Sequence, residues 1–128
     1  MIVLDANVLI SYMEHGDVHA AQAFEILDTE EELALHPLTL AECAVSPARA
    51  GQLGKFRRMV DRLTVTIWKP DDDHVFRIAQ LRATTPLKLP DCCVLDTARS
   101  LGATLATFDQ ALAKQASALG IDVTNGSQ

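Results

Sequence analysis

The sequence lacks any long uninterrupted apolar run, although apolar residues make up 48% of its 128 residues. A membrane-spanning helix needs about 18–20 predominantly apolar residues in succession, and no segment approaches that length. The first residues, from Met1 to Asp5, also lack the basic segment that begins a secretory signal peptide. We therefore expect a cytoplasmic protein that does not enter a membrane.

Cysteine is scarce and is poorly spaced for its common structural uses. Cys43, Cys92 and Cys93 are odd in number, two of them are adjacent, and no C-x-x-C pair occurs. These features disfavour both a disulfide framework and a zinc site. None of the four histidines has a partner at the short sequence spacing typical of metal ligands. We expect the cysteines to be small buried hydrophobic residues and assign no catalytic role to any histidine.

Basic residues are outnumbered, with 11 lysines and arginines against 17 aspartates and glutamates, which gives a net charge of −6. A protein with net negative charge repels nucleic acid and is expected to bind it weakly. Four of the acidic residues are, however, predicted to share one site, which leaves a net charge of −2 elsewhere. A bound divalent cation would offset part of the site's own charge, so net charge does not exclude a nuclease.

Five of the eleven basic residues fall within residues 49–62. Apolar residues such as Phe56, Met59 and Val60 recur among them at helical spacing, which predicts an amphipathic helix with a basic outer face. That face is either solvated or in contact with RNA phosphates or an acidic partner.

Short apolar segments alternate with helical segments along the whole chain. Residues 1–4, 33–35, 63–67, 104–106 and 121–123 have the composition of strands. The segments between them have helical spacing, and this alternation predicts an α/β fold with a parallel sheet. We expect one domain over residues 1–124, followed by a polar tail at 125–128.

Four acidic residues, which we call the acidic quartet, lie where predicted strands end or helices begin: Asp5, Glu42, Asp91 and Asp109. The carboxyl ends of parallel strands meet at one edge of a sheet, so we expect these side chains to converge. Oxygen ligands alone suit Mg²⁺ or Mn²⁺. Such an ion offsets the repulsion among carboxylates and activates water. The quartet therefore predicts a metal-dependent phosphodiester hydrolase.

Each acid alone has a simpler explanation. Glu42 completes the S/T-x-x-E pattern of a helix capping box that begins at Thr39. Asp5 after an apolar strand is also found in receiver domains and in haloacid-dehalogenase-like phosphatases. The phosphatases need a second aspartate where this chain has Asn7. A small phosphatase or phosphoacceptor domain is therefore a less favoured alternative.

Four segments taken together resemble PIN-domain ribonucleases, specifically the VapC-type toxins of bacterial toxin–antitoxin pairs. Their order and spacing match over essentially residues 1–124. The segments are Val3–Asn7, Thr39–Glu42, Leu89–Asp91 with Leu95–Ala98, and Ala103–Asp109.

The resemblance implies a three-layer α/β/α sandwich around a five-stranded parallel sheet. It also implies endonucleolytic cleavage of RNA that depends on Mg²⁺, or on Mn²⁺ as a substitute, with the acidic quartet as catalytic residues and metal ligands. Asn7 and Thr107 would orient ligands or bound waters. Such toxins are typically homodimers, and a VapB-type antitoxin inhibits them by placing a basic side chain among the carboxylates. The alternative is a catalytically inactive PIN-like module that binds RNA or a partner.

Two residues leave alternatives open. Asp96 replaces the small apolar residue that many relatives carry, and it lies about 140° around the predicted helix from Asp91. It either supports the metal site or a second metal, or it is a buried or interface carboxylate. Trp68, the single tryptophan, either packs in the core or an interface or stacks on a base.

Overall fold

The computed structural model describes residues 1–126, so the predicted tail at 125–128 lies partly outside the described residues. Five short strands form one sheet in the order β3-β2-β1-β4-β5, and every neighbouring pair is parallel. The strands are β1 (Ile2–Leu4), β2 (Leu33–Leu35), β3 (Thr66–Ile67), β4 (Thr104–Ala106) and β5 (Val123–Thr124). The predicted α/β fold with a five-stranded parallel sheet is confirmed.

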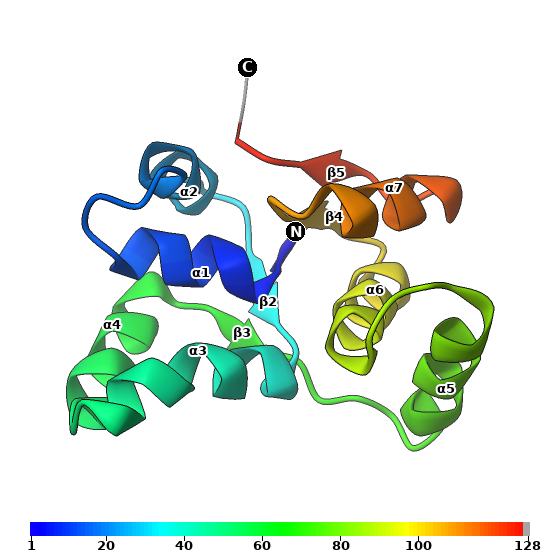
Figure 1. Cartoon of the computed structure of the whole chain (residues 1–128), viewed down its shortest axis with the longest axis horizontal. Coiled ribbons are helices and arrows are strands. Elements are labelled where there is room, and N and C mark those ends of the chain that lie inside the picture. Colours follow the sequence, from blue (N-terminus) through cyan, green and yellow to red (C-terminus); the bar gives the residue numbers. More distant parts are fainter. Residues whose placement is uncertain (127–128) are drawn as a thin grey trace.

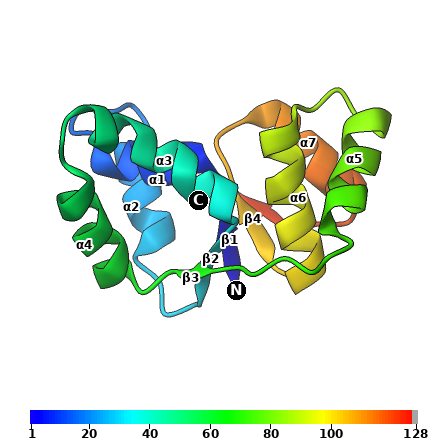
Figure 2. The same cartoon turned by 90° about the horizontal axis from the view of Figure 1, so that it is seen from below.

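Helices cover both faces of this sheet. In Figures 1 and 2, α1, α2, α3 and α4 lie to one side of the strands, and α5, α6 and α7 lie to the other. This arrangement is the three-layer sandwich that the sequence resemblance implies. Within residues 1–126, no helix is both long and apolar enough to cross a membrane. The helices are α1 (Ala6–Met13), α2 (Ala20–Leu27), α3 (Pro37–Arg49), α4 (Leu53–Leu63), α5 (His74–Thr84), α6 (Leu89–Leu101) and α7 (Gln110–Ala118).

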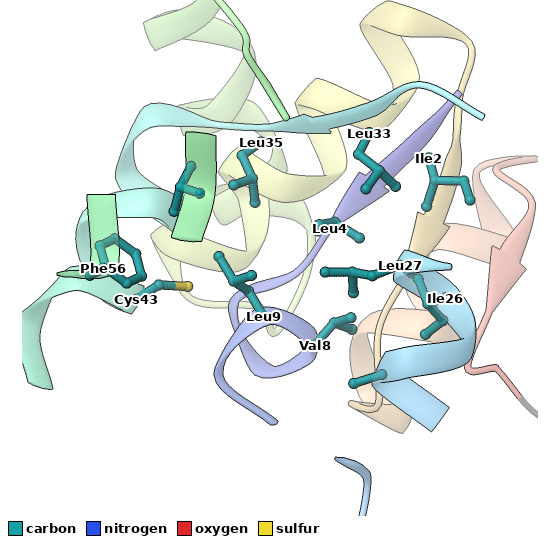
Figure 3. Packing of buried hydrophobic residues seen from close by; sticks show 13 residues of the cluster. Ile2, Leu4, Val8, Leu9, Ile26, Leu27, Leu33, Leu35, Cys43 and Phe56 are labelled. Carbon is teal, nitrogen blue, oxygen red and sulfur yellow. The ribbon is translucent and has the colours of Figure 1, made fainter. Parts of the chain in front are cut away.

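The central strand β1 is buried on both faces. Leu4 packs in a cluster with Val8 of α1 and Phe56 of α4 (Figure 3). Val3 points the opposite way and packs with Leu95 of α6 in a second cluster. Alternate residues of a strand face opposite sides of the sheet, so three apolar residues in a row are required here. The two clusters hold the end of β1 firmly in the middle of the molecule.

The start of α3 differs from the prediction. The helix begins at Pro37, and the ring of His36 accepts a hydrogen bond from the backbone N–H of Leu38 at 2.9 Å, whereas the sequence suggested a cap at Thr39. Proline favours the first helical position because its fixed φ suits the helix and its missing N–H is not needed there. The capping-box explanation of Glu42 is therefore wrong.

Two further boundaries differ. Pro47, which on sequence grounds would end or kink a helix, lies inside α3, and the helix continues to Arg49. Proline close to a helix end removes only one internal hydrogen bond. Strand β3 is shorter than predicted because α4 extends to Leu63 and ends at Thr64 in a left-handed conformation, with φ of 53°.

Helix α4 has the amphipathic character that the sequence predicts. Phe56 and Val60 are buried, whereas Arg57, Arg58 and Arg62 are exposed. The basic residues of this helix therefore face solvent and do not form part of the core.

Candidate active site

The acidic quartet gathers where the strand order reverses. The chain passes from β1 through β2 to β3 and then crosses to β4 on the other side of β1. Ligands of open parallel sheets bind outside the carboxyl ends of the strands at such a point. Asp5 directly follows β1 and Asp109 lies shortly after β4. Glu42 and Asp91 belong to α3 and α6, two helices that contact each other.

Asp5 is buried and firmly held. Its Oδ1 accepts a hydrogen bond from the first backbone N–H of α1 at 2.8 Å, and its Oδ2 accepts one from the hydroxyl of Thr107 at 2.7 Å. The Thr107 oxygen in turn accepts from the backbone N–H of Asp109 at 3.0 Å. The side-chain oxygen of Asn7 accepts from the backbone N–H of Phe108 at 3.3 Å. Asn7 and Thr107 therefore tie the end of β1 to the end of β4.

The other three acids lie at more accessible positions. Glu42 is exposed in the second turn of α3, and Asp91 is partly buried in the first turn of α6. Asp109 is exposed and caps α7, where its Oδ1 accepts from the backbone N–H of Leu112 at 3.0 Å. The quartet therefore combines one buried carboxylate, that of Asp5, with three that are more accessible to solvent.

The acids influence one another electrostatically. Burial raises the pKa of Asp5 to about 6, and the charges of Asp91 and Asp109 add to this effect, although the Thr107 hydrogen bond opposes it. Burial and the charge of Asp91 raise the pKa of Glu42. Burial and the charge of Asp109 raise the pKa of Asp91. The charge of Asp91 therefore acts on both Asp5 and Glu42, and the charge of Asp109 acts on both Asp5 and Asp91.

The chemistry of this donor set fits a hard divalent cation. The side chains offer carboxylate oxygens, which are the ligands that Mg²⁺ and Mn²⁺ prefer. The raised pKa values of Asp5, Glu42 and Asp91 reflect negative charge that is unfavourable without a counterion. A cation among the four carboxylates would remove that cost.

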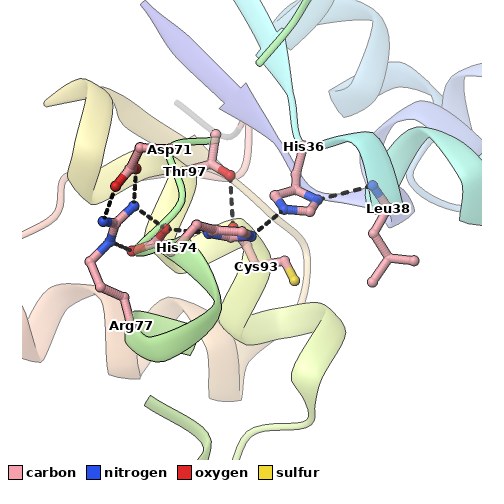
Figure 4. Close-up of polar contacts among 8 residues, drawn as sticks. His36, Leu38, Asp71, His74, Arg77, Cys93 and Thr97 are labelled. Atoms are coloured by element: carbon pink, nitrogen blue, oxygen red, sulfur yellow. Dashed lines mark hydrogen bonds and ion pairs between the residues drawn. The ribbon is translucent and has the colours of Figure 1, made fainter. Parts of the chain in front are cut away.

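A buried polar cluster that the sequence did not predict links the starts of α3 and α5 to α6 (Figure 4). Asp96 has no exposed surface and pairs with Nε of Arg77 at 2.8 Å and with Nδ1 of His74 at 2.7 Å. The Nε2 atoms of His74 and His36 are 2.9 Å apart. Asp96 is therefore a buried, paired carboxylate. The ring of Trp68 lies edge-on to that of His74, at 5.6 Å between centroids, so the tryptophan packs on this cluster.

Two of the histidines are partners in space although no short sequence spacing links them. His36 and His74 are 38 residues apart in the sequence, beyond the short spacings at which a metal-ligand pattern is recognised. Only the fold, which places the start of α3 beside the start of α5, brings the two rings together. A histidine directly before Pro37 was the one local signal for His36, since side chains at this position commonly cap helices.

Asp5→Asn is expected to stabilise the metal-free protein at neutral pH. The pKa of Asp5 is raised to about 6 in the folded chain, from 3.8. Ionisation of Asp5 therefore lowers the free energy of unfolding as the pH rises through this interval, and asparagine does not ionise. The gain should be on the order of 2 kcal/mol near pH 7 and should vanish near pH 4. Urea unfolding in EDTA at both pH values measures it.

Added Mg²⁺ provides the control for this comparison. A cation that binds the ionised carboxylate should stabilise the unsubstituted chain more than the Asp5→Asn variant. Equal stabilities of the two proteins near pH 7 in EDTA would contradict the raised pKa.

Comparisons with known proteins find similar structures. Over its full length, the chain is 27% identical to a chain of a toxin–antitoxin complex from Klebsiella pneumoniae, with a TM-score of 0.77 and 99% of that chain covered. FitAcB from Neisseria gonorrhoeae gives a TM-score of 0.73 at 20% identity, with 98% of each chain covered. No match was found among curated protein sequences.

A third structure has the same fold at lower identity. The sarcin–ricin loop cleaving toxin VapC20 from Mycobacterium tuberculosis gives a TM-score of 0.74 at 16% identity, covering 94% of this chain and 96% of that one. The sequence itself matches the PIN domain family over residues 2–118. The resemblance predicted from four short segments is confirmed at the level of family and fold. The chain belongs to the PIN domain family.

Proposed function

We propose that this chain is a Mg²⁺-dependent endoribonuclease and the toxin of a toxin–antitoxin pair. The observation that carries the proposal is a set of four carboxylates from four different parts of the chain, near the reversal point of the sheet. The charge of Asp91 acts on Asp5 and Glu42, and the charge of Asp109 acts on Asp5 and Asp91. Membership of the PIN domain family supports a nuclease. We further propose that residues 1–124 act as one nuclease domain.

Each residue of the quartet has a distinct role in this proposal. Asp5 and Asp91 hold Mg²⁺, or Mn²⁺ in its place, directly. Glu42 and Asp109 complete the site directly or through water, and Glu42 orients the attacking water. A divalent ion at such a site lowers the pKa of water and stabilises charge on the leaving oxygen. Thr107 fixes the Asp5 carboxylate through its hydrogen bond, so one oxygen of the central ligand is already oriented.

The proposed partners are RNA, a VapB-type antitoxin and a second copy of the chain, in the cytoplasm. The similar Klebsiella pneumoniae protein belongs to a toxin–antitoxin complex, which supports an antitoxin partner. Glu42 and Asp109 are exposed, so a basic side chain from such a partner could pair with them. That pairing would compete with a metal ion for the same carboxylates.

Cleavage of a panel of structured RNAs by the purified chain, separated from any partner, tests the proposal. Specific cuts are expected with Mg²⁺ or Mn²⁺ and none with EDTA. Cleavage that persists in EDTA would contradict metal dependence. RNA binding without cleavage in either metal would instead identify the inactive binding module, and metal titration by calorimetry would show whether the quartet still binds an ion.

A further inference from the structure

The side chains of His36, His74 and Cys93, which we call the histidine–cysteine cluster, combine two imidazoles and a thiol in one buried place. A ligand atom from each lies within 4.8 Å of the other two, and all three residues are buried. His36 precedes α3, His74 begins α5 and Cys93 belongs to α6. Figure 4 shows the two rings meeting nitrogen to nitrogen with Cys93 close by. The cluster thus joins the start of α3 to the two consecutive helices α5 and α6.

Hydrogen bonds fix the positions of the ring protons. Nδ1 of His74 faces a carboxylate oxygen of Asp96 at 2.7 Å and must donate to it, which leaves Nε2 of His74 with a lone pair. Nδ1 of His36 accepts from the backbone N–H of Leu38, so the ring proton of His36 sits on Nε2. That proton is donated to Nε2 of His74 across 2.9 Å. A single proton therefore lies between the two nitrogens.

We infer that the histidine–cysteine cluster is a binding site for a borderline divalent cation such as Zn²⁺, which takes the place of that proton. His74 already has the arrangement of a metal ligand, since its other nitrogen donates to a carboxylate. Arg77 holds that carboxylate with two hydrogen bonds, at 2.8 and 3.1 Å. Two imidazole nitrogens and a thiolate suit Zn²⁺ and Co²⁺, with water as a fourth ligand.

Cation binding moves two protons. The proton on Nε2 of His36 transfers to Nδ1 of the same ring, and the thiol proton of Cys93 leaves to solvent. His36 then no longer accepts from Leu38, so one helix-capping hydrogen bond is lost. The loss of a cap is small beside the binding free energy of Zn²⁺ at nitrogen and sulfur ligands. The lone pair of His74 is already available.

The cluster and the acidic quartet select different ions. The quartet offers oxygen ligands and suits Mg²⁺, whereas nitrogen and sulfur ligands bind Mg²⁺ poorly. The cluster also connects α3, which carries Glu42, to α6, which carries Asp91. A bound cation would fix the spacing between these two helices. The inference concerns metal binding alone and does not depend on nuclease activity.

Titration of the full chain with Co²⁺, after removal of divalent ions and in excess Mg²⁺, tests the inference. Thiolate coordination gives a charge-transfer band in the near ultraviolet. We expect this band to saturate at one equivalent and to disappear when Zn²⁺ displaces Co²⁺. Cys93→Ser should abolish the band, and Cys92→Ser, at the adjacent buried thiol, should retain it. Asp96→Asn should weaken Co²⁺ binding by about 10–100-fold.

The unsubstituted chain alone shows whether the cluster binds Co²⁺, so this result does not depend on whether any variant folds. Absence of the band in the folded chain overturns the inference and leaves a hydrogen-bonded histidine pair. A band that persists undiminished in folded Cys93→Ser, or that is lost in folded Cys92→Ser, also overturns it. Circular dichroism establishes that each variant is folded.

Discussion

Asp91→Asn is expected to lower the rate of Mg²⁺-dependent RNA cleavage by more than about 100-fold, because groups that only support metal ligands already cost 10–100-fold. Asparagine has nearly the size of aspartate, but it removes the negative charge that a divalent ion requires. Asp91 is only partly buried in the first turn of α6, so the fold should tolerate the change. Initial cleavage rates over a range of Mg²⁺ concentrations measure the effect.

Asp122→Asn is the matched control for this experiment. Asp122 is an exposed aspartate immediately before β5, at the opposite edge of the sheet from the acidic quartet. This variant should cleave RNA at the unsubstituted rate. If Asp91→Asn also retained that rate, Asp91 would not be a metal ligand, and the proposed roles in the quartet would need to be reassigned.

Asp96→Asn is expected to lower the free energy of unfolding by about 2 kcal/mol, because buried hydrogen-bond donors lose their acceptor. The Asp96 carboxylate has no exposed surface and accepts hydrogen bonds from both Arg77 and His74. The amide would leave the guanidinium paired with Asp71 alone. The N–H groups of the new asparagine would also face the N–H donors of Arg77 and His74. Urea unfolding followed by circular dichroism gives the difference.

The exposed Asp72, just before α5, provides the comparison for Asp96. Asp72→Asn should leave the unfolding midpoint unchanged, because no buried charge loses its partner. A similarly small effect of Asp96→Asn would mean that the buried network contributes little to stability. In that case the carboxylate would serve mainly to orient His74.

The sequence predicted the features that local patterns determine. Alternating apolar strands and helical segments predicted the parallel sheet, and its parallel order brings Asp5 and Asp109 to one edge. The acidic quartet could be proposed because each member lies beside a recognisable strand end or helix start. These inferences needed only the direction of the strands and did not require knowledge of any side-chain contact.

The remaining features depend on tertiary contacts. The pairing of His36 with His74 arises because α3 and α5 begin side by side, which no sequence spacing records. The true cap of α3 was missed because a serine or threonine signal at Thr39 competed with a less common histidine cap at His36. Asp96 has the helical position of an apolar residue, and its burial becomes explicable only when Arg77 is seen beside it.

The distribution of the quartet along the chain bears on how such a protein could be made safely. Its four carboxylates are spread from residue 5 to residue 109, and each comes from a different segment. A growing polypeptide therefore has no complete site until synthesis has passed Asp109 and β4 has paired with β1. If the proposed ribonuclease activity needs all four carboxylates, this order of assembly delays activity beyond most of translation. A fragment that ends before Asp109 would lack one of the four proposed ligands.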